Sequence, residues 1–179
     1  CEKALDKLEK LALSMKARLD KEPREEVGLS AIRLGTKCGG SDWTTAAVSN
    51  PAIGFVSDVV VKNGGISIQG ETTGWFGGED YFLRHARNEQ VAARLLALME
   101  ETYQRALQVG RRIEEGNPTP GNMEGGITTL AEKALGNVKK GGTAPVEGIL
   151  EIGEYPQAGS GLYLANNPGL DPISLLGLT

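Results

Sequence analysis

Residues 29–42 read Leu29-Ser-Ala-Ile-Arg-Leu-Gly-Thr-Lys-Cys-Gly-Gly-Ser-Asp42, an apolar segment that runs directly into a glycine-rich turn. Residues 29–34 are predicted to form a short strand, with the turn following its carboxyl end. A second strand is predicted at residues 66–69, Ile-Ser-Ile-Gln, and it runs in the same way into Gly70-Glu71. Two predicted strands therefore end in polar or glycine-rich turns, at residues 35–42 and 70–71.

Helical patterns alternate with the strands. Apolar residues at spacings of three and four predict helices at residues 3–20, 88–115 and 129–138. A further helix is predicted at residues 50–62, because Pro51 suits a first helical turn and Asn63-Gly64-Gly65 is a strong stop. Residues 117–122 are expected to form a loop, the last strand is predicted at residues 146–152, and the tail is expected to be a loop.

This alternation predicts an α/β fold with a largely parallel sheet, flanking helices and a Rossmann-like three-layer arrangement. A chain of 179 residues is expected to form a single domain. Both ends look cut, since the chain starts at Cys1 and stops at Thr179 straight after an apolar run. We therefore expect a fragment of a larger multidomain protein. Ligands bind beyond the carboxyl ends of parallel strands, so neighbouring strands would bring the two turns into one crevice.

Bulk properties exclude several classes of protein. A net charge of -4 and a pI near 5.2 leave no basic footprint for a nucleic acid. No segment approaches the roughly 18 apolar residues of a membrane span, and the start resembles neither a signal nor a transit peptide. Only Cys1 and Cys38 are cysteines, which favours a reducing cytoplasm over a disulfide framework.

The turn at Gly39-Gly40 has two interpretations. Glycines allow a positive φ or a close approach of the backbone to a ligand, and successive N–H groups can bind an anion. A purely structural turn is as good an interpretation of this pattern on its own. The P-loop is excluded because its Gly-Lys-Ser/Thr ending is missing, and the three-glycine spacing of a dinucleotide-binding fingerprint is absent as well.

Cys38 fits a metal ligand, a nucleophile or a small buried side chain. A nucleophile would require a histidine partner, and His85 is the single histidine of the sequence. A Cys38–His85 pair therefore stays open as a minor alternative. A zinc finger is excluded, because no second pair of ligands has suitable spacing.

Four carboxylates lie near predicted strand ends or turns, and they are Asp42, Glu71, Glu79 and Asp80. Such groups serve acid–base chemistry on carbon acids and bind hard metals. Asp42 equally fits a helix cap, and Glu79 and Asp80 fit solvated positions. Glu71 directly follows an apolar strand, so it is the best functional candidate.

Together these segments resemble the altronate/galactarate dehydratase family of hydro-lyases, which also includes sulfolactate sulfo-lyase subunits. The resemblance extends from residue 29 to about residue 179 and rests on motifs in series rather than on one motif. Cys1-Glu2 also resembles an upstream Gly-Cys-Glu element of the family. The matching stretches are residues 34–42, 49–54 with Ser57-Asp58, 71–73 with 76–79, 121–129, 132–136, 140–145 and 168–172.

The resemblance implies removal of water from an altronate- or galactarate-type sugar acid to give a 2-keto-3-deoxy acid. It implies activation by a divalent metal, Fe²⁺ or alternatively Mn²⁺, with an iron–sulfur cluster left open. The proton next to a carboxylate is poorly acidic, so a base, an acid and a stabilising cation are needed. Remaining domains or a second subunit are the expected protein partners, with homo-oligomers expected.

Chemistry and placement assign roles within that family. Cys38 and Glu71 are predicted to be the catalytic residues and the metal ligands. Residues of the turn are predicted to bind the substrate carboxylate. Thr72 and Thr73 are predicted to bind the substrate hydroxyl groups. The predicted substrate-binding residues are Lys37, Gly39, Gly40, Ser41, Asp42, Thr72 and Thr73.

The sequence departs from the family pattern at Gly74, at Asp80 and at Asn166-Asn167, which puts the substrate in doubt. A sulfo-lyase acting on sulfolactate and a non-catalytic sugar-acid binding or assembly module are the alternatives. The family's small N-terminal domain is not part of this chain. The 179 residues alone are therefore expected to be inactive.

Overall fold

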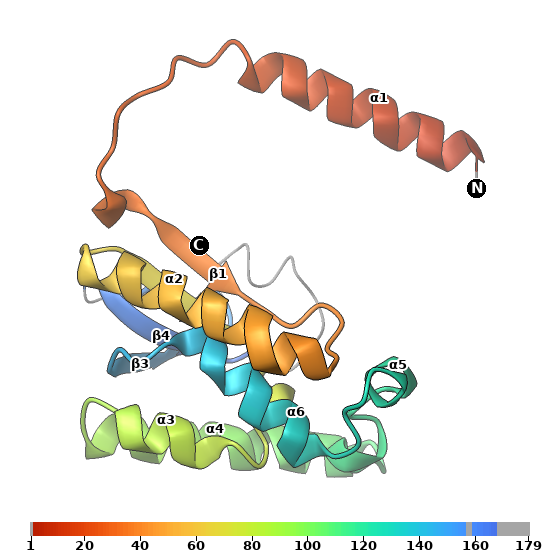
Figure 1. The fold of residues 1–179 in the computed structure, drawn as a ribbon, viewed down its shortest axis with the longest axis vertical. Helices are drawn as coiled ribbons and strands as arrows, with labels where there is room; N and C mark the ends of the chain where they lie inside the picture. Colours follow the sequence, from red (N-terminus) through yellow and green to blue (C-terminus); the bar gives the residue numbers. More distant parts are fainter. Residues whose placement is uncertain (1, 157–158, 168–179) are drawn as a thin grey trace.

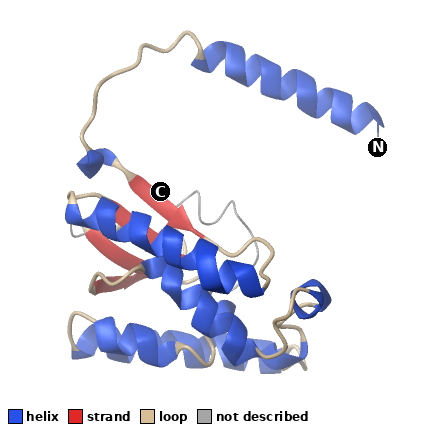
Figure 2. Ribbon diagram, viewed as in Figure 1, coloured by secondary structure: helices blue, strands red, loops and turns tan. Residues whose placement is uncertain are grey.

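The computed structural model describes residues 2–156 and 159–167, whose core is a four-stranded parallel sheet (Figures 1 and 2). The strand order is β1-β2-β4-β3 and all neighbouring pairs are parallel. The strands are β1 (Arg33–Thr36), β2 (Ile66–Gln69), β3 (Val146–Leu150) and β4 (Gly161–Ala165). The α/β class with a parallel sheet and flanking helices is thus confirmed.

The β1-α2-β2 unit forms because its local signals agree. Helix α2 (Asn50–Lys62) has Pro51 in its first turn and ends before Gly64, whose φ of 84° requires a glycine. A five-residue π-helical segment, η2 (Thr45–Ser49), precedes it and extends the helical run beyond its predicted start. The hydroxyl of Ser57 donates to Ser67 Oγ at 2.7 Å, which fixes α2 against β2.

Helices cover one face of the sheet. On this face Leu162 and Leu164 of β4 pack with Leu95 and Leu98 of α4 (Glu89–Gln108) and with Phe82 of α3 (Glu79–His85). The side chains of Ser67 and Gln69 point the same way and bond to α2 and to Asn137 at the end of α6 (Leu130–Asn137). The opposite face carries the smaller buried cluster Ile66, Ile68, Leu150, Tyr163 and Ala165. No described helix joins that cluster, so the second helical layer of the predicted three-layer arrangement stays a prediction.

Strand β4 corrects the sequence-based prediction of a loop after residue 152. Its five residues are all buried, and it lies in the interior of the sheet between β2 and β3. Strand β1 is also displaced from its prediction, since residues 29–31 form a 3-10 turn, η1 (Leu29–Ala31), and the ladder begins at Arg33. The carboxyl end of β1 still leads directly into the turn at Cys38.

Helix boundaries changed where glycine or a cap interrupts the pattern. Helix α4 ends at Gln108 and not at residue 115, because Gly110 adopts a φ of 72°; a separate 3-10 turn, η4 (Ile113–Glu115), follows. The predicted loop at 117–122 contains the start of a short helix, α5 (Pro120–Glu124), capped by Thr119. Two further 3-10 turns are η3 (Thr72–Gly74) and η5 (Val138–Gly141).

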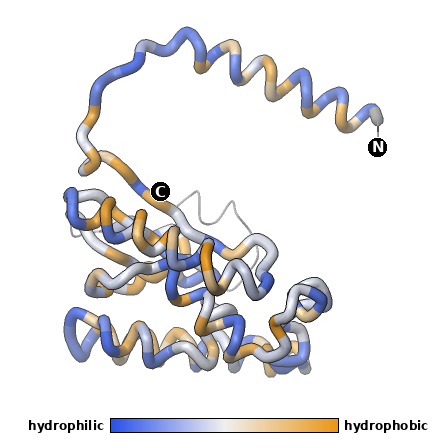
Figure 3. The backbone as a smooth tube through the Cα atoms, viewed as in Figure 1, coloured by the Kyte–Doolittle hydropathy of each residue, from blue (hydrophilic) through white to orange (hydrophobic). Residues whose placement is uncertain are grey.

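Helix α1 (Glu2–Leu19) confirms the predicted N-terminal helix and stands apart from the rest of the chain (Figure 1). Apolar residues recur along it, and Leu5 and Leu19 are 64% and 69% exposed (Figure 3). No helix within residues 2–156 and 159–167 has both the length and the apolar character that crossing a membrane requires.

Candidate active site

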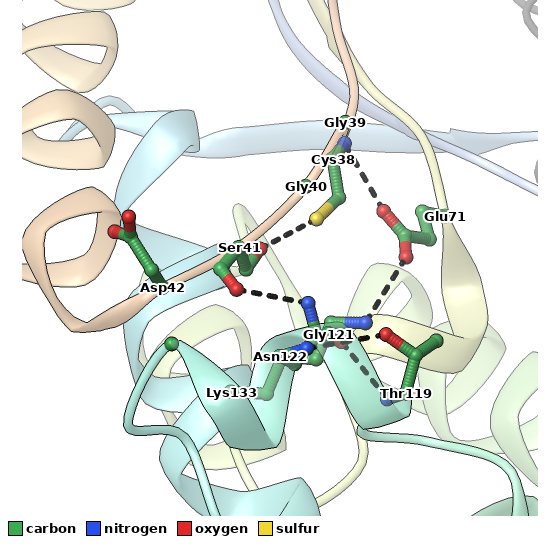
Figure 4. Close-up of a pocket in the computed structure, with 11 residues that line it drawn as sticks. Cys38, Gly39, Gly40, Ser41, Asp42, Glu71, Thr119, Gly121, Asn122 and Lys133 are labelled. Atoms are coloured by element: carbon green, nitrogen blue, oxygen red, sulfur yellow. Dashed lines mark hydrogen bonds and ion pairs between the residues drawn. The ribbon is translucent and has the colours of Figure 1, made fainter.

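A cleft of about 400 Å³ lies at the carboxyl ends of β1 and β2 (Figure 4). The turn of residues 38–42 forms one wall and Glu71 contributes from the end of β2. The other lining residues come from the α5–α6 region, and they are Thr119, Gly121, Asn122, Gly125 and Lys133. Two segments that are neighbours in the sheet thus meet a third segment that lies about fifty residues further along the chain.

Glu71 is the buried carboxylate of this cleft. Its side chain is held by the turn opposite, since the Cys38 backbone N–H donates to Glu71 Oε2 at 3.0 Å. Its backbone has φ 73° and ψ 67°, the left-handed region that non-glycine residues rarely adopt. Such strain costs roughly 1–3 kcal/mol and persists where the surrounding structure enforces it. The predicted sharing of one crevice by the two strand-end turns is confirmed.

The thiol of Cys38 lies 2.7 Å from the hydroxyl of Ser41, and either atom can be the donor. The amide of Asn122 donates to the Ser41 carbonyl at 2.9 Å, which ties the turn to α5. Gly39 and Gly40 are exposed, neither has a positive φ, and an added Cβ would meet no atom within 4 Å. Positive φ is therefore not the reason for these glycines, and close approach to a ligand remains the functional interpretation.

Asp42 caps the helical segment that follows it. Its Oδ1 accepts from the Thr44 hydroxyl, the Thr45 hydroxyl and the Thr45 backbone N–H, each at 2.7 Å. The Thr45 and Thr44 hydroxyl groups are the main cause that lowers the pKa of Asp42 to about 2. In Figure 4 the carboxylate points away from Glu71. Asp42 lines the cleft, but its carboxylate is engaged in the capping interaction that the sequence offered as the alternative.

Three predicted substrate-binding residues lie outside the lining of this cleft, namely Lys37, Thr72 and Thr73. Thr72 is fully buried, and its hydroxyl donates to the Ala165 carbonyl and accepts from the Asn167 backbone N–H. This geometry gives Thr72 a structural role at the end of β4, and its predicted substrate contact stays a prediction. Thr73 lines a smaller adjoining cavity of about 190 Å³ that shares Glu71 and Lys133 with the cleft.

Two buried lysines accompany Glu71, and no sequence pattern marks either as a candidate site residue. Lys133 Nζ donates to Asn117 Oδ1 at 2.6 Å and lies 4.0 Å from Glu71 Oε1. Lys140 Nζ donates to Asn137 Oδ1, and burial is the main cause that lowers the pKa of Lys140, while the nearby Cys38 and Glu71 act in the opposite direction. The Lys139-Lys140 pair looks like a solvated helix end in sequence, yet only Lys139 is exposed. The single available signal was that both lysines lie inside motifs that carry the family resemblance.

A metal at this position would find two protein donors, Cys38 and Glu71. Among the described residues no group of three His, Cys, Asp or Glu side chains is placed to hold a metal ion. His85 is not one of the lining residues; its Nδ1 contacts the Tyr81 carbonyl at 2.7 Å. The donor set is therefore incomplete in this part of the chain. The minor alternative of a Cys38–His85 pair gains no support, because the thiol contacts Ser41.

Comparison with known proteins assigns most of the chain to one family. The family model described as D-galactarate/Altronate dehydratase, C-terminal, matches residues 29–179. The chain belongs to this family. The predicted resemblance is thereby confirmed, and the region that matches includes every residue that lines the cleft.

Individual relatives agree with the family assignment. The chain is 37% identical over 153 residues to an altronate dehydratase of Bacillus subtilis, covering 86% of this chain and 30% of that protein. It is 35% identical over 154 residues to an Escherichia coli galactarate dehydratase (L-threo-forming), covering 86% and 29%. It is 35% identical over 147 residues to a (2R)-sulfolactate sulfo-lyase subunit beta of Chromohalobacter salexigens, covering 80% and 37%. The chain thus spans about a third of the length of these relatives.

Proposed function

We propose that this chain forms part of the active site of a sugar-acid dehydratase, which converts an altronate- or galactarate-type acid into a 2-keto-3-deoxy acid. The observation that carries the proposal is the Cys38 N–H bond to Glu71 Oε2 at 3.0 Å. It joins the two strand-end motifs across a cleft with hydroxyl, amide and carboxylate groups in its lining. Ligands of open parallel sheets bind at this edge.

Dehydration breaks a C–H bond next to the carboxylate and a C–O bond at the next carbon, and it releases water and an enol that becomes the keto acid. The base must reach the C–H proton and must lie in a place of low water content. Glu71 is suited to this role, since it is buried, its Oε2 accepts from the Cys38 N–H, and Lys133 Nζ lies 4.0 Å from its Oε1, beyond hydrogen-bonding distance. Oε1 is therefore the atom that we assign to accept the proton.

The cleft lining offers matching groups for the rest of a polyhydroxy acid. The Ser41 hydroxyl and the exposed backbone of Gly39 and Gly40 lie along one wall, and we assign them to bind the substrate. Thr73 remains a candidate for a hydroxyl contact through the smaller cavity. Lys37 and Asp42 are weaker candidates, because Lys37 is outside the lining and Asp42 is engaged in its cap.

The metal remains part of the proposal. Thiolate and carboxylate are both suitable ligands for iron, so Cys38 and Glu71 would supply two of its ligands, Glu71 through Oε2 so that Oε1 still accepts the proton. Further ligands would come from the substrate or from the rest of the protein. A bound Fe²⁺, or Mn²⁺ in its place, would supply positive charge to the enolate that forms when the proton leaves.

The remaining parts of the protein complete the proposal. Because the chain spans about 30% of its dehydratase relatives, we propose that further domains or a second subunit close the cleft. We further propose a cytoplasmic homo-oligomer. A second candidate activity is release of sulfite from sulfolactate, which the similarity to a sulfo-lyase subunit favours.

The test uses the complete polypeptide that contains these residues. Its metal content is measured, and keto-acid formation is assayed over hexonates, aldarates and sulfolactate. We expect turnover of a sugar acid. Glu71→Gln is expected to lower kcat by about 100-fold or more, as loss of a general base does, and Cys38→Ala is expected to lower both the metal content and kcat. A folded protein that binds sugar acids and turns over none of them would instead support a binding module.

A further inference from the structure

Glu71 and Lys133 form an ion pair in the wall shared by two adjoining cavities. Both residues, together with Thr119, line the 400 Å³ cleft and also the adjoining 190 Å³ cavity. Lys133 projects from α6, and its side chain is only 5% exposed. A lysine ammonium thus reaches the bottom of the site from the side opposite to the Cys38 turn, as Figure 4 shows.

The ammonium of Lys133 has donor capacity that the described residues leave unused. A lysine Nζ carries three N–H donors and no acceptor. One donor is used by Asn117 Oδ1 at 2.6 Å, while Glu71 Oε1 at 4.0 Å is too far for a hydrogen bond. The ammonium is already ion-paired with Glu71 and hydrogen-bonded to Asn117, and its remaining N–H donors can bind an anionic group that enters the cavity.

The charge balance around the pair also favours an added anion. Lys140 is buried at 2% exposure, donates to Asn137 Oδ1, and lies close enough to interact electrostatically with Cys38, Glu71 and Lys133. Two buried lysines therefore surround one buried carboxylate. Asp42 does not correct this balance, because Thr44 and Thr45 hold its carboxylate at the start of the next helical segment.

We propose that Lys133 is a catalytic residue that binds the substrate carboxylate in the cleft. This inference rests on the proposed function and names how the acid is recognised. Lys133 Nζ and Glu71 Oε1 are 4.0 Å apart. A substrate carboxylate bound to Lys133 Nζ therefore has its neighbouring carbon, the one bonded to the carboxylate group, near Glu71 Oε1. That carbon carries the proton to be removed. The negative charge that moves onto the carboxylate oxygens as the proton leaves is then stabilised by the same ammonium.

Binding measurements on the complete polypeptide test this inference. The probes are galactarate and gluconate, each compared with the uncharged alditol of the same carbon skeleton, galactitol or sorbitol. Lys133→Met keeps an unbranched side chain as far as Cε and removes the ammonium group. Lys139→Met is the matched control, because Lys139 is exposed and lies outside the cleft. Circular dichroism and thermal unfolding report whether each variant is folded.

We expect wild type and Lys139→Met to bind an acid more tightly than its alditol. In Lys133→Met, the Kd for the acid is expected to rise about 10- to 100-fold, the range for loss of a charge-assisted hydrogen bond, with no change for the alditol. Reductive methylation of the wild-type protein gives a second readout that needs no variant. Labelling of Lys133 should be slowed by the acid and unaffected by the alditol.

Each contrary outcome has a separate meaning. Turnover of a sugar acid by Lys133→Met with unchanged KM would overturn the role of Lys133 and leave the dehydratase proposal standing. If carboxylate binding depends on Lys133 but the protein turns over no acid, the role of Lys133 in binding would stand and the dehydratase proposal would be overturned. Failure of wild type to distinguish acid from alditol, or no protection of Lys133 from methylation, would overturn the carboxylate site.

Discussion

At the scale of single residues, the candidate site depends on a backbone conformation that its key side chain does not favour. Glu71 follows Gly70 at the end of β2 and adopts a left-handed conformation, and this turns its carboxylate toward the Cys38 turn. Gly74 makes room for it, since a Cβ there would lie 2.5 Å from Asn137 Nδ2 and 3.4 Å from Glu71 Cδ. The departure from the family pattern at Gly74 is therefore compatible with the local packing.

The capping role of Asp42 predicts that the stability of the protein depends on pH. Its pKa is about 2 in the folded protein, below the ordinary 3.8. Between these values the unfolded chain binds more protons than the folded one. The stability that Asp42 contributes is thus fully present above about pH 4 and is lost as the pH falls through 2.

Asp42→Asn keeps an oxygen acceptor at the cap and removes the titrating group. The unfolding free energy of the wild type, measured by urea unfolding from pH 5 to pH 2, should therefore fall more steeply than that of the variant. Equal slopes for the two proteins would show that the cap does not depend on the charge of Asp42.

Residue-level prediction from sequence succeeded where a strand determines the position. Cys38 and Glu71 follow neighbouring parallel strands, so the geometry of the sheet brings them together. Lys133 and Asn122 reach the same cleft from α6 and α5, and only tertiary packing places them there. Sequence periodicity carries no information about that packing, which explains why neither residue was nominated.

At the scale of secondary-structure elements, β4 is the clearest case of structure imposed by neighbours. Its residues 161–165 follow a glycine-rich segment and precede Asn166-Asn167, which is the pattern of a loop. The segment becomes a strand because β2 and β3 pair with it on both sides. By contrast, the β1-α2-β2 unit was predictable from local signals such as Pro51 and the glycines after α2.

Leu164 tests whether β4 belongs to the core. It has no exposed surface and packs with Leu95 and Leu98 of α4. Leu164→Ala is expected to lower the unfolding free energy by about 2–5 kcal/mol, measured by urea unfolding. The matched control is Leu96→Ala on α4, where the side chain is 50% exposed and a loss below about 1 kcal/mol is expected. Similar losses at both positions would place β4 outside the core.

At the scale of the whole molecule, the described residues contain one side of the proposed active site. The cleft at the strand ends has an incomplete set of metal donors within residues 2–156 and 159–167. The chain spans only 29–37% of its curated relatives. The missing groups would come from further domains or subunits, and the motif at residues 168–172 lies outside the described residues, as does Cys1.

The 179-residue chain alone is therefore predicted to be inactive. Purified by itself and supplied with Fe²⁺ or Mn²⁺, it should form no keto acid from hexonates or aldarates, whereas the complete polypeptide should. Measurable turnover by the isolated chain would show that the cleft needs no further domain.

The most direct test of the central claim is the kcat for keto-acid formation by Glu71→Gln in the complete polypeptide. Glu79→Gln is measured beside it, because Glu79 lies outside the cleft and accepts a hydrogen bond from the Gly77 backbone N–H. We predict a loss of about 100-fold or more for Glu71→Gln and less than about twofold for Glu79→Gln. A Glu71→Gln protein with the wild-type rate would contradict the assignment of this crevice as the dehydratase site.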